Sequence, residues 1–222
     1  MSIYAGIPTV NNLRYLCETI ESIKSKYPIK ILIVDNGSED ETRNWVAGSG
    51  YESILNPTNI GVAPAWNQVL YWGLSHNDCK LIFVLNNDIV LRHDAMDNMI
   101  ESVFENEKEG ISGVNIGNHP SMLAHTTKPE PRYSPAMNFS CFGLTVKTIK
   151  RIGFFDEGFK LAYFEDNDYH HRMQLEGIDA SSDLWAPFAH YGSRTIKEGK
   201  VNVASAFEEN RKYFLMKWGF LP

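Results

Sequence analysis

Short apolar runs that end in turn residues alternate with helix-period segments through about the first 90 residues of this 222-residue chain. Residues 3–7 and 29–34 are two such runs, closed by Pro8 and by the turn sequence Asp35-Asn36-Gly37-Ser38. Between them, apolar residues recur at helical spacing over residues 13–23. Strands joined through helices pair in parallel, with right-handed crossovers. The pattern therefore predicts an α/β fold built on a single doubly wound, mostly parallel sheet.

The rest of the chain extends this sheet. We expect strands at residues 53–55, 81–85, 138–146 and 180–185, and helices at residues 39–46, 63–74, 94–107, 148–152, 168–175 and 204–218. Residues 117–135 hold four prolines without any period and are expected to form a long loop. The composition is 43% hydrophobic, enough for a sizeable core, and no linker interrupts it, so we expect one domain over residues 1–222.

Charge and cysteine content narrow the function classes. The net charge of −6 gives no basic surface for nucleic acid or an anionic membrane. Cys17, Cys79 and Cys141 are far apart and lack metal-ligand spacing, which favours reduced thiols and a cytoplasmic location. No apolar stretch approaches the roughly 20 residues that span a bilayer, so we expect a soluble protein.

The expected strand at residues 81–85 ends abruptly in Asn86-Asn87-Asp88. In α/β sheets, ligands bind at the carboxyl edge, where such side chains gather. One carboxylate with neighbouring amide oxygens suits Mg²⁺ or Mn²⁺ shared with a substrate diphosphate, because these ions keep few protein ligands. The alternative is that these three residues only form a turn after the strand.

Three carboxylates, Glu165, Asp166 and Asp168, lie within four residues just before an expected helix. Charges this close raise at least one pKa, which favours a general base. The alternative is a helix start whose acids complement the helix dipole, with Arg172 neutralising Asp168 one turn later. His190 follows another strand-like segment, and it either has a structural hydrogen bond or completes a metal shell.

Residues 59–67 contain Asn59, Gly61 and Asn67 around the start of an expected helix. Backbone amides at such a start can bind phosphate, although one glycine without a lysine is a weak phosphate loop. Neither the P-loop pattern nor the dinucleotide glycine triad occurs in the chain.

Taken in order, these segments resemble the inverting GT-A glycosyltransferases of family 2, especially the rhamnosyltransferase-like branch. The resemblance covers about residues 3–195. It rests on seven motifs: Ile7-Pro8-Thr9-Val10-Asn11, Ile33-Val34-Asp35-Asn36-Gly37-Ser38-Glu39-Asp40, Asn59-x-Gly61 with Asn67, Leu85-Asn86-Asn87-Asp88, Gly153-Phe154-Phe155-Asp156-Glu157, Phe164-Glu165-Asp166-x-Asp168 with Arg172, and His190.

This resemblance implies a GT-A fold with a Rossmann-like nucleotide-sugar half at residues 1–90, a variable acceptor and catalytic half at residues 91–200, and a C-terminal helix at residues 201–222. It implies a metal-dependent, inverting transfer from a UDP-, dTDP- or GDP-sugar, with Mn²⁺ or Mg²⁺ held by Asp88 and His190. It also implies that Asp166 is the general base, with Glu165 beside it. The donor would be bound by Pro8, Thr9, Asp35, Asn36, Asn59, Gly61, Asn67, Asn86 and Asn87.

The acceptor stays open. We expect it to be framed by residues 117–135 and 139–142, and a glycan, a lipid-linked glycan, a protein, a small molecule or a modified nucleic-acid base would each offer a hydroxyl. The aromatic-rich helix at residues 204–218 is expected to dock over the sheet. A homodimer face, or a peripheral contact with the inner face of the membrane, is the alternative for this helix.

Two other function classes compete with a transferase. One is a non-catalytic nucleotide or carbohydrate binder built on the same fold, in which the base or the metal carboxylate would be lost. The other is a sugar nucleotidyltransferase. It is disfavoured because residues 8–12 lack the glycine-rich, basic loop that holds a triphosphate.

Overall fold

The computed structural model describes residues 2–192 and 203–222. The strands are β1 (Ser2–Thr9), β2 (Ile29–Asn36), β3 (Glu52–Asn56), β4 (Cys79–Leu85), β5 (Ile89–Leu91), β6 (Gly110–Asn115), β7 (Tyr133–Ser134), β8 (Cys141–Thr145) and β9 (Ala180–His190). The helices are α1 (Leu13–Ser22), α2 (Thr42–Gly48), α3 (Val62–Leu74), α4 (Ala95–Phe104), α5 (Val146–Ile152), α6 (Glu165–Leu175) and α8 (Ala204–Trp218), with a short 3₁₀ helix η1 (Pro120–His125).

Over the described residues the strands form one sheet in the order β3-β2-β1-β4-β8-β6-β9-β5, and β7 pairs with β9. The strands β3, β2, β1 and β4 are parallel, as expected from their helical crossovers. The second half is mixed, because β8 runs antiparallel to β4 and β6 while β6 and β9 are parallel. The predicted α/β class and the single sheet are confirmed.

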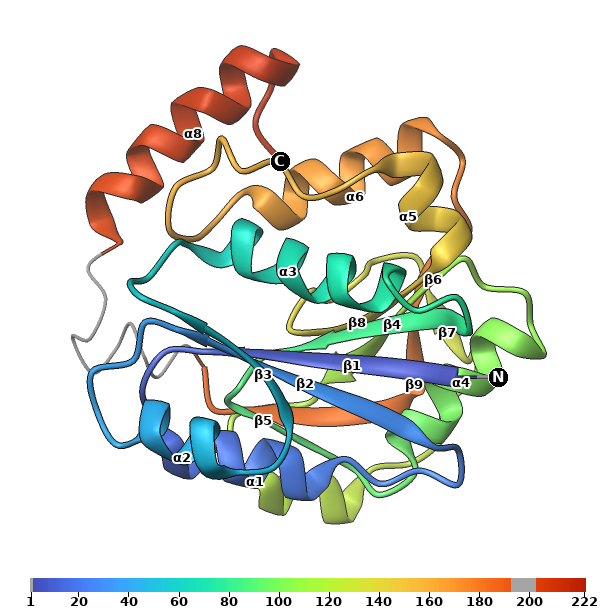
Figure 1. Ribbon diagram of the computed structural model, residues 1–222. Coiled ribbons are helices and arrows are strands. Elements are labelled where there is room, and N and C mark those ends of the chain that lie inside the picture. Colours follow the sequence, from blue (N-terminus) through green and yellow to red (C-terminus); the bar gives the residue numbers. More distant parts are fainter. Residues whose placement is uncertain (1, 193–202) are drawn as a thin grey trace.

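Helices cover both faces of this sheet (Figure 1). Along β1, Ile3 and Ile7 belong to the core under α1, α2 and α4, whereas Tyr4 belongs to the core under α3, α5 and α6. Successive residues of a strand point to opposite faces, so an apolar run can fill two cores at once. The sheet is therefore buried on both faces, and its ligand site is confined to its edge.

The second half contains three strands that the sequence pattern did not predict, namely β5, β6 and β7. Several expected elements also have different bounds, and two of these differences bear on the site. Strand β9 continues to His190 instead of ending at residue 185, and α6 begins at Glu165 instead of residue 168. The acidic cluster thus lies in the first turn of a helix and not before it.

Helix α8 does not dock over the sheet, so that prediction is wrong. It packs on α6 and on the segment before it (Figure 1), where Phe214 is fully buried against Phe159 and Phe164. On its outer side, Met216 is 76% exposed. The dimer face and the membrane contact therefore stay predictions. No described helix combines the length and the apolar character needed to cross a membrane.

Candidate active site

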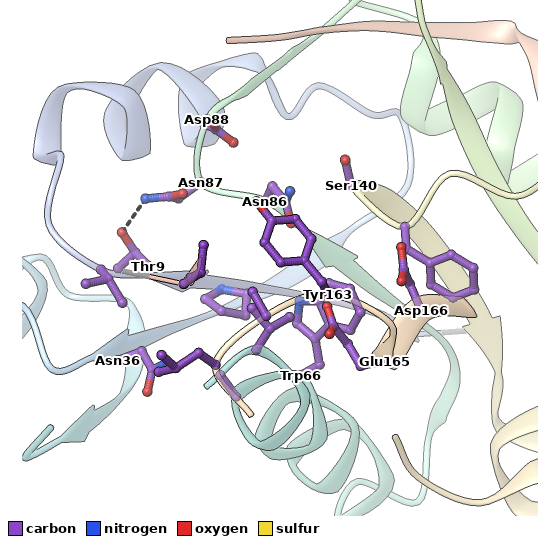
Figure 2. A pocket seen from close by; sticks show the side chains of 18 of the residues that line it. Thr9, Asn36, Trp66, Asn86, Asn87, Asp88, Ser140, Tyr163, Glu165 and Asp166 are labelled. Atoms are coloured by element: carbon purple, nitrogen blue, oxygen red, sulfur yellow. Dashed lines mark hydrogen bonds between the residues drawn. The ribbon is translucent and has the colours of Figure 1, made fainter. Parts of the chain in front are cut away.

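A cavity of about 500 Å³ opens at the carboxyl ends of the central strands. Figure 2 shows Asn87 and Asp88 on one side of it and Glu165 and Asp166 across from them. Most of the predicted site residues line it: Pro8, Thr9, Asn36, Asn59, Asn86, Asn87, Asp88, Glu165, Asp166 and His190. Residues that are far apart in the sequence are thus brought to one edge of the sheet.

Strand pairing brings Asp88 and His190 together. Ile89 of β5 lies opposite His190 of β9, and the backbone N–H of Tyr191 donates to the carbonyl oxygen of Asp88 at 2.9 Å. The Nε2 atom of His190 lies 2.9 Å from Oδ1 of Asp88. This Nε2 is buried and makes no hydrogen bond of good geometry within the described part of the chain. An imidazole nitrogen and a carboxylate oxygen placed in this way fit a divalent cation.

Residues 2–192 and 203–222 contain no group of three or more His, Cys, Asp or Glu side chains that could hold a metal ion. A cation at Asp88 and His190 would have two protein ligands from the described residues, with substrate oxygens and water available for other positions. Mg²⁺ and Mn²⁺ sites that work on phosphates have this composition. The two residues fit a metal that is shared with a diphosphate.

The amides next to Asp88 are tied to neighbouring strands. Nδ2 of Asn87 donates to Oγ1 of Thr9 at 2.7 Å (Figure 2). The backbone N–H of Asn86 donates to the carbonyl oxygen of Ser140 at 2.9 Å. These bonds fix the end of β4 between β1 and β8, and the bond to Thr9 gives the side chain of Asn87 a defined direction at the cavity wall.

The two carboxyl groups in the first turn of α6 differ in burial. Glu165 is 5% exposed, and burial, reinforced by the charge of Asp166, raises its pKa to about 8. Burial also raises the pKa of Asp166, against a hydrogen bond of 2.8 Å from the backbone N–H of Asn167. A pKa of about 8 keeps Glu165 protonated near neutral pH.

Asp168, the third acid of this cluster, has a structural environment. It is fully buried, and it binds Nε of Arg172 at 2.9 Å and Nζ of Lys217 at 2.7 Å. Arg172 contacts Oδ2 of Asp168 and Lys217 contacts Oδ1. Nε1 of Trp218 also donates to Oδ1, at 2.9 Å. Asp168 thus anchors α8 to α6, in agreement with the alternative of charge neutralisation by Arg172.

Contrary to the prediction, Asp35 does not line the cavity. Asp35 and Asn36 are successive residues of β2 and so face opposite sides of the sheet. Asp35 is fully buried towards α2 and binds Nη1 of Arg43 at 2.8 Å. Asn36 faces the cavity, and its Nδ2 donates to Oδ1 of Asn59 at 3.0 Å and to the carbonyl oxygen of Gly61 at 3.1 Å.

Gly61 and Asn67 do not line the cavity either. Gly61 precedes the first turn of α3 with φ +97°, and its carbonyl oxygen accepts the Asn36 bond. Asn67 binds the backbone of Phe155 in both directions, donating to its carbonyl oxygen at 2.9 Å and accepting from its N–H at 2.8 Å. In this structure both residues hold the walls of the cavity in place.

Several lining residues carried no sequence signal. Leu161, Ala162 and Tyr163, from the loop before α6, line the cavity, together with Trp66 of α3. Two segments were expected to frame the acceptor. Residues 139–142 contribute Phe139 and Ser140 to the lining, whereas residues 117–135 contribute none of the described lining. Arg132 of that segment binds Asp183 at 2.7 Å and so holds the segment against β9.

The described lining is acidic. It includes the carboxyl groups of Asp88, Glu165 and Asp166, but neither a lysine nor an arginine from the described part of the chain. A diphosphate placed beside these groups would meet charges of its own sign, and a bound divalent cation would reverse that balance. An acidic lining of this kind suits a divalent cation at Asp88 and His190.

Comparisons with known proteins agree with this geometry. The sequence model described as Glycosyl transferase family 2 matches residues 4–173. A curated relative, a galactofuranosyl glycosyltransferase of Leishmania donovani, is 24% identical over 212 residues, covering 75% of this chain and 49% of the relative. The chain thus spans about half the length of that relative.

Two solved structures share the fold. The mannosyltransferase PcManGT from Pyrobaculum calidifontis, in complex with GDP-Man and Mn²⁺, has a TM-score of 0.69 at 16% identity, covering 99% of this chain and 65% of that one. TarS of S. aureus, residues 1–349 in complex with UDP-GlcNAc, has a TM-score of 0.68 at 14% identity, covering 96% of this chain and 65% of that one.

The predicted rhamnosyltransferase-like branch stays a prediction. The match to the family model spans most of the chain, and the two solved glycosyltransferases share its sheet and helices. The chain belongs to glycosyl transferase family 2 and has the GT-A fold.

Proposed function

We propose that this chain is an inverting, metal-dependent glycosyltransferase that moves a sugar from a nucleotide-diphosphate sugar to an acceptor hydroxyl. One observation carries the proposal: the pair Asp88 and His190 and the pair Glu165 and Asp166 line a single cavity. A site with a metal-ligand pair at one wall and a carboxylate at another has the parts that a transfer from a diphosphate leaving group needs.

The donor would lie along the ends of β1, β2 and β4. Pro8, Thr9, Asn36 and Asn59 would contact the nucleoside, and Asn86 and Asn87 would orient the diphosphate and the sugar. Mn²⁺ or Mg²⁺ bound by Asp88 and His190 would offset the charge of the diphosphate and stabilise it as it leaves. The related mannosyltransferase crystallised with GDP-Man and Mn²⁺ supports a donor and a cation of these classes.

Asp166 would act on the acceptor. Its carboxylate takes the proton of the acceptor hydroxyl while the oxygen attacks the anomeric carbon from the face opposite the diphosphate. The new carbon–oxygen bond forms as the bond from the anomeric carbon to the diphosphate oxygen breaks, and the electron pair leaves with the nucleotide. The configuration at the anomeric carbon inverts, and no covalent intermediate with the protein is needed.

The acceptor would enter beside Phe139, Ser140 and Tyr163, which line the cavity together with Asp166. Aromatic rings next to a polar hydroxyl are a usual surface for a sugar ring. A glycan acceptor therefore suits this side best, and the other hydroxyl acceptors are the alternatives.

The test combines a donor screen with two variants. With Mn²⁺ or Mg²⁺, the wild-type chain should hydrolyse or transfer one of the UDP-, dTDP- or GDP-sugars. Asp166→Asn should lose about 10²–10⁴-fold in transfer rate and keep nucleotide binding, since it removes only the proton acceptor. Asp88→Ala should instead weaken metal-dependent binding.

Asp179→Asn is the matched control, because Asp179 is an exposed partner of Lys108 outside the cavity lining. It should leave transfer unchanged. Full activity of Asp166→Asn would overturn the base assignment. Binding of nucleotide without turnover of any donor by the wild-type chain would favour the non-catalytic binder.

A further inference from the structure

The loop at residues 160–164 shapes the cavity and leads directly into Glu165 and Asp166. Leu161, Ala162 and Tyr163 line the cavity. Three of its residues have left-handed backbones, with φ of 53° at Leu161, 81° at Tyr163 and 73° at Phe164. None of them is glycine, so this conformation costs free energy and persists only where the surroundings hold it.

The side chain of Asn210, on α8, holds this loop. Asn210 is 1% exposed, and its Oδ1 accepts from the backbone N–H of Lys160 at 2.7 Å. Its Nδ2 donates to the carbonyl oxygens of Lys160 at 2.8 Å, Ala162 at 2.9 Å and Tyr163 at 3.1 Å. Of the other two carbonyls in the loop, that of Leu161 accepts from the N–H of Val62 at 2.6 Å and that of Phe164 from the N–H of Asp168 at 2.9 Å. The loop is thus held between α8 and α3.

We propose that Asn210 is a positioning residue of the transfer reaction, which keeps Asp166 at the cavity by fixing the loop that precedes it. This inference rests on the function proposed above. A carboxamide presents two N–H donors on one atom and an acceptor oxygen on another, and Asn210 uses both ends on the loop. An aspartate would face the three carbonyl oxygens with a negative charge, and a leucine would leave them without their donor.

The first test follows backbone hydrogen exchange, which needs no substrate. In Asn210→Leu and Asn210→Asp, the amides of residues 160–166 should exchange at least about tenfold faster than in the wild-type chain, because the bonds that hold the loop are gone. Tyr213→Phe is the control on the same helix. It removes the 3.0 Å bond to Asp156 and touches none of the loop carbonyls, so exchange in the loop should not change.

The second test is kinetic. Both Asn210 variants should lose about 10- to 100-fold in kcat, while the donor KM stays within about threefold, because a small displacement of the base affects the chemical step and not donor binding. The acidic limb of the kcat profile should move to lower pH, since a loosened loop exposes Asp166 to water. Tyr213→Phe should keep the wild-type profile.

Unchanged exchange at residues 160–166 together with unchanged kcat would overturn the proposal. Faster exchange throughout the chain, with kcat and donor affinity lost together, would also overturn it by showing that Asn210 only stabilises the fold. A wild-type chain that transfers no sugar would contradict the proposed function instead, and the exchange measurement would still decide whether Asn210 holds the loop.

Discussion

At the scale of single residues, the difference in burial between Glu165 and Asp166 decides which of them can accept a proton. A carboxyl group that holds its proton at neutral pH cannot act as a base, and the pKa of Glu165 is raised to about 8 by burial. The proton on Glu165 also spares Asp166 a second negative charge beside it. A protonated Glu165 leaves Asp166 as the proposed proton acceptor of the pair.

The raised pKa of Glu165 predicts a pH-dependent stability. Below its ordinary pKa of 4.5, Glu165 is neutral in both the folded and the unfolded chain, and its contribution to stability is lost as the pH rises to about 8. Glu165→Gln has no proton to lose. Relative to the wild-type chain, this variant should gain about 1–3 kcal/mol in the free energy of unfolding at alkaline pH and close to nothing near pH 4.5.

Urea unfolding at the two pH values measures this difference. Glu105→Gln, a change at an exposed side chain, serves as the control and should show no pH-dependent gain. An equal effect of Glu165→Gln at both pH values would contradict the assigned protonation state.

Residue types and spacing singled out Asp88, Asp166 and His190 as candidates, the resemblance to the family assigned their roles, and all three line the cavity. Residue types and spacing did not separate Asp35 from Asn36, since only the register of β2 decides which of two neighbours faces the cavity. They also missed the loop with Leu161 and Tyr163. Left-handed positions are usually marked by glycine or asparagine, and here they are occupied by residues that give no such signal.

At the scale of elements, α3 lies directly on β1 because Gly6 has no side chain. A Cβ atom added at Gly6 would lie 2.2 Å from Cγ1 of Val69. Gly6→Ala should therefore cost about 1–3 kcal/mol of stability, as overpacking does elsewhere in protein cores. This contact matters for the site, since α3 carries Trp66 into the cavity wall.

A double-mutant cycle with Val69→Ala tests the contact. The double variant Gly6→Ala/Val69→Ala should recover at least about 1 kcal/mol relative to the sum of the single changes. It removes the contacts of 2.2 Å and 2.3 Å with Cγ1 and Cγ2 and leaves the milder one of 2.8 Å with Cβ. Gly48→Ala is the control, since nothing lies within 4 Å of its Cβ position. Additive effects of the two single changes would show that another contact limits the approach of α3.

Strands with strong apolar runs were predictable, and those that depend on neighbours were not. β5 has three residues and β7 has two, so neither can show a period. β6 contains Gly110 and Gly113, which weaken the strand pattern, and it forms between β8 and β9. β5 nevertheless matters for the site, because its pairing with β9 brings Asp88 to His190.

At the scale of the whole molecule, the parallel half of the sheet supplies one wall of the cavity and the mixed half supplies the other. Asn36, Asn59 and Asn86 come from the first half, whereas Asp166 and His190 come from the second. The predicted division at about residue 90, and the roles of its two halves, stay a prediction. The packing of α8 against α6 could not be predicted from the sequence, because the aromatic residues of a helix do not show which surface they cover.

The acidic lining predicts that donor binding and metal binding are coupled. A nucleoside diphosphate should raise the Tm of the chain when Mn²⁺ is present and have little effect when EDTA has removed it. At a ligand concentration of about 100 times Kd, the gain of about 2.7 kcal/mol corresponds to roughly 5–10 °C for a chain of this size. Asp88→Ala should abolish the shift, and a shift of the same size in EDTA would contradict the coupling.

The central claim is that one cavity holds the cation, the donor and the base. Anomalous diffraction from crystals grown with Mn²⁺ and the nucleotide sugar selected in the donor screen tests this claim most directly. The account predicts a manganese peak bound by Asp88 and His190, diphosphate oxygens in its coordination shell, and the carboxylate of Asp166 facing the anomeric carbon from the side opposite the diphosphate. A manganese peak away from this pair, or a donor bound outside the cavity, would contradict it.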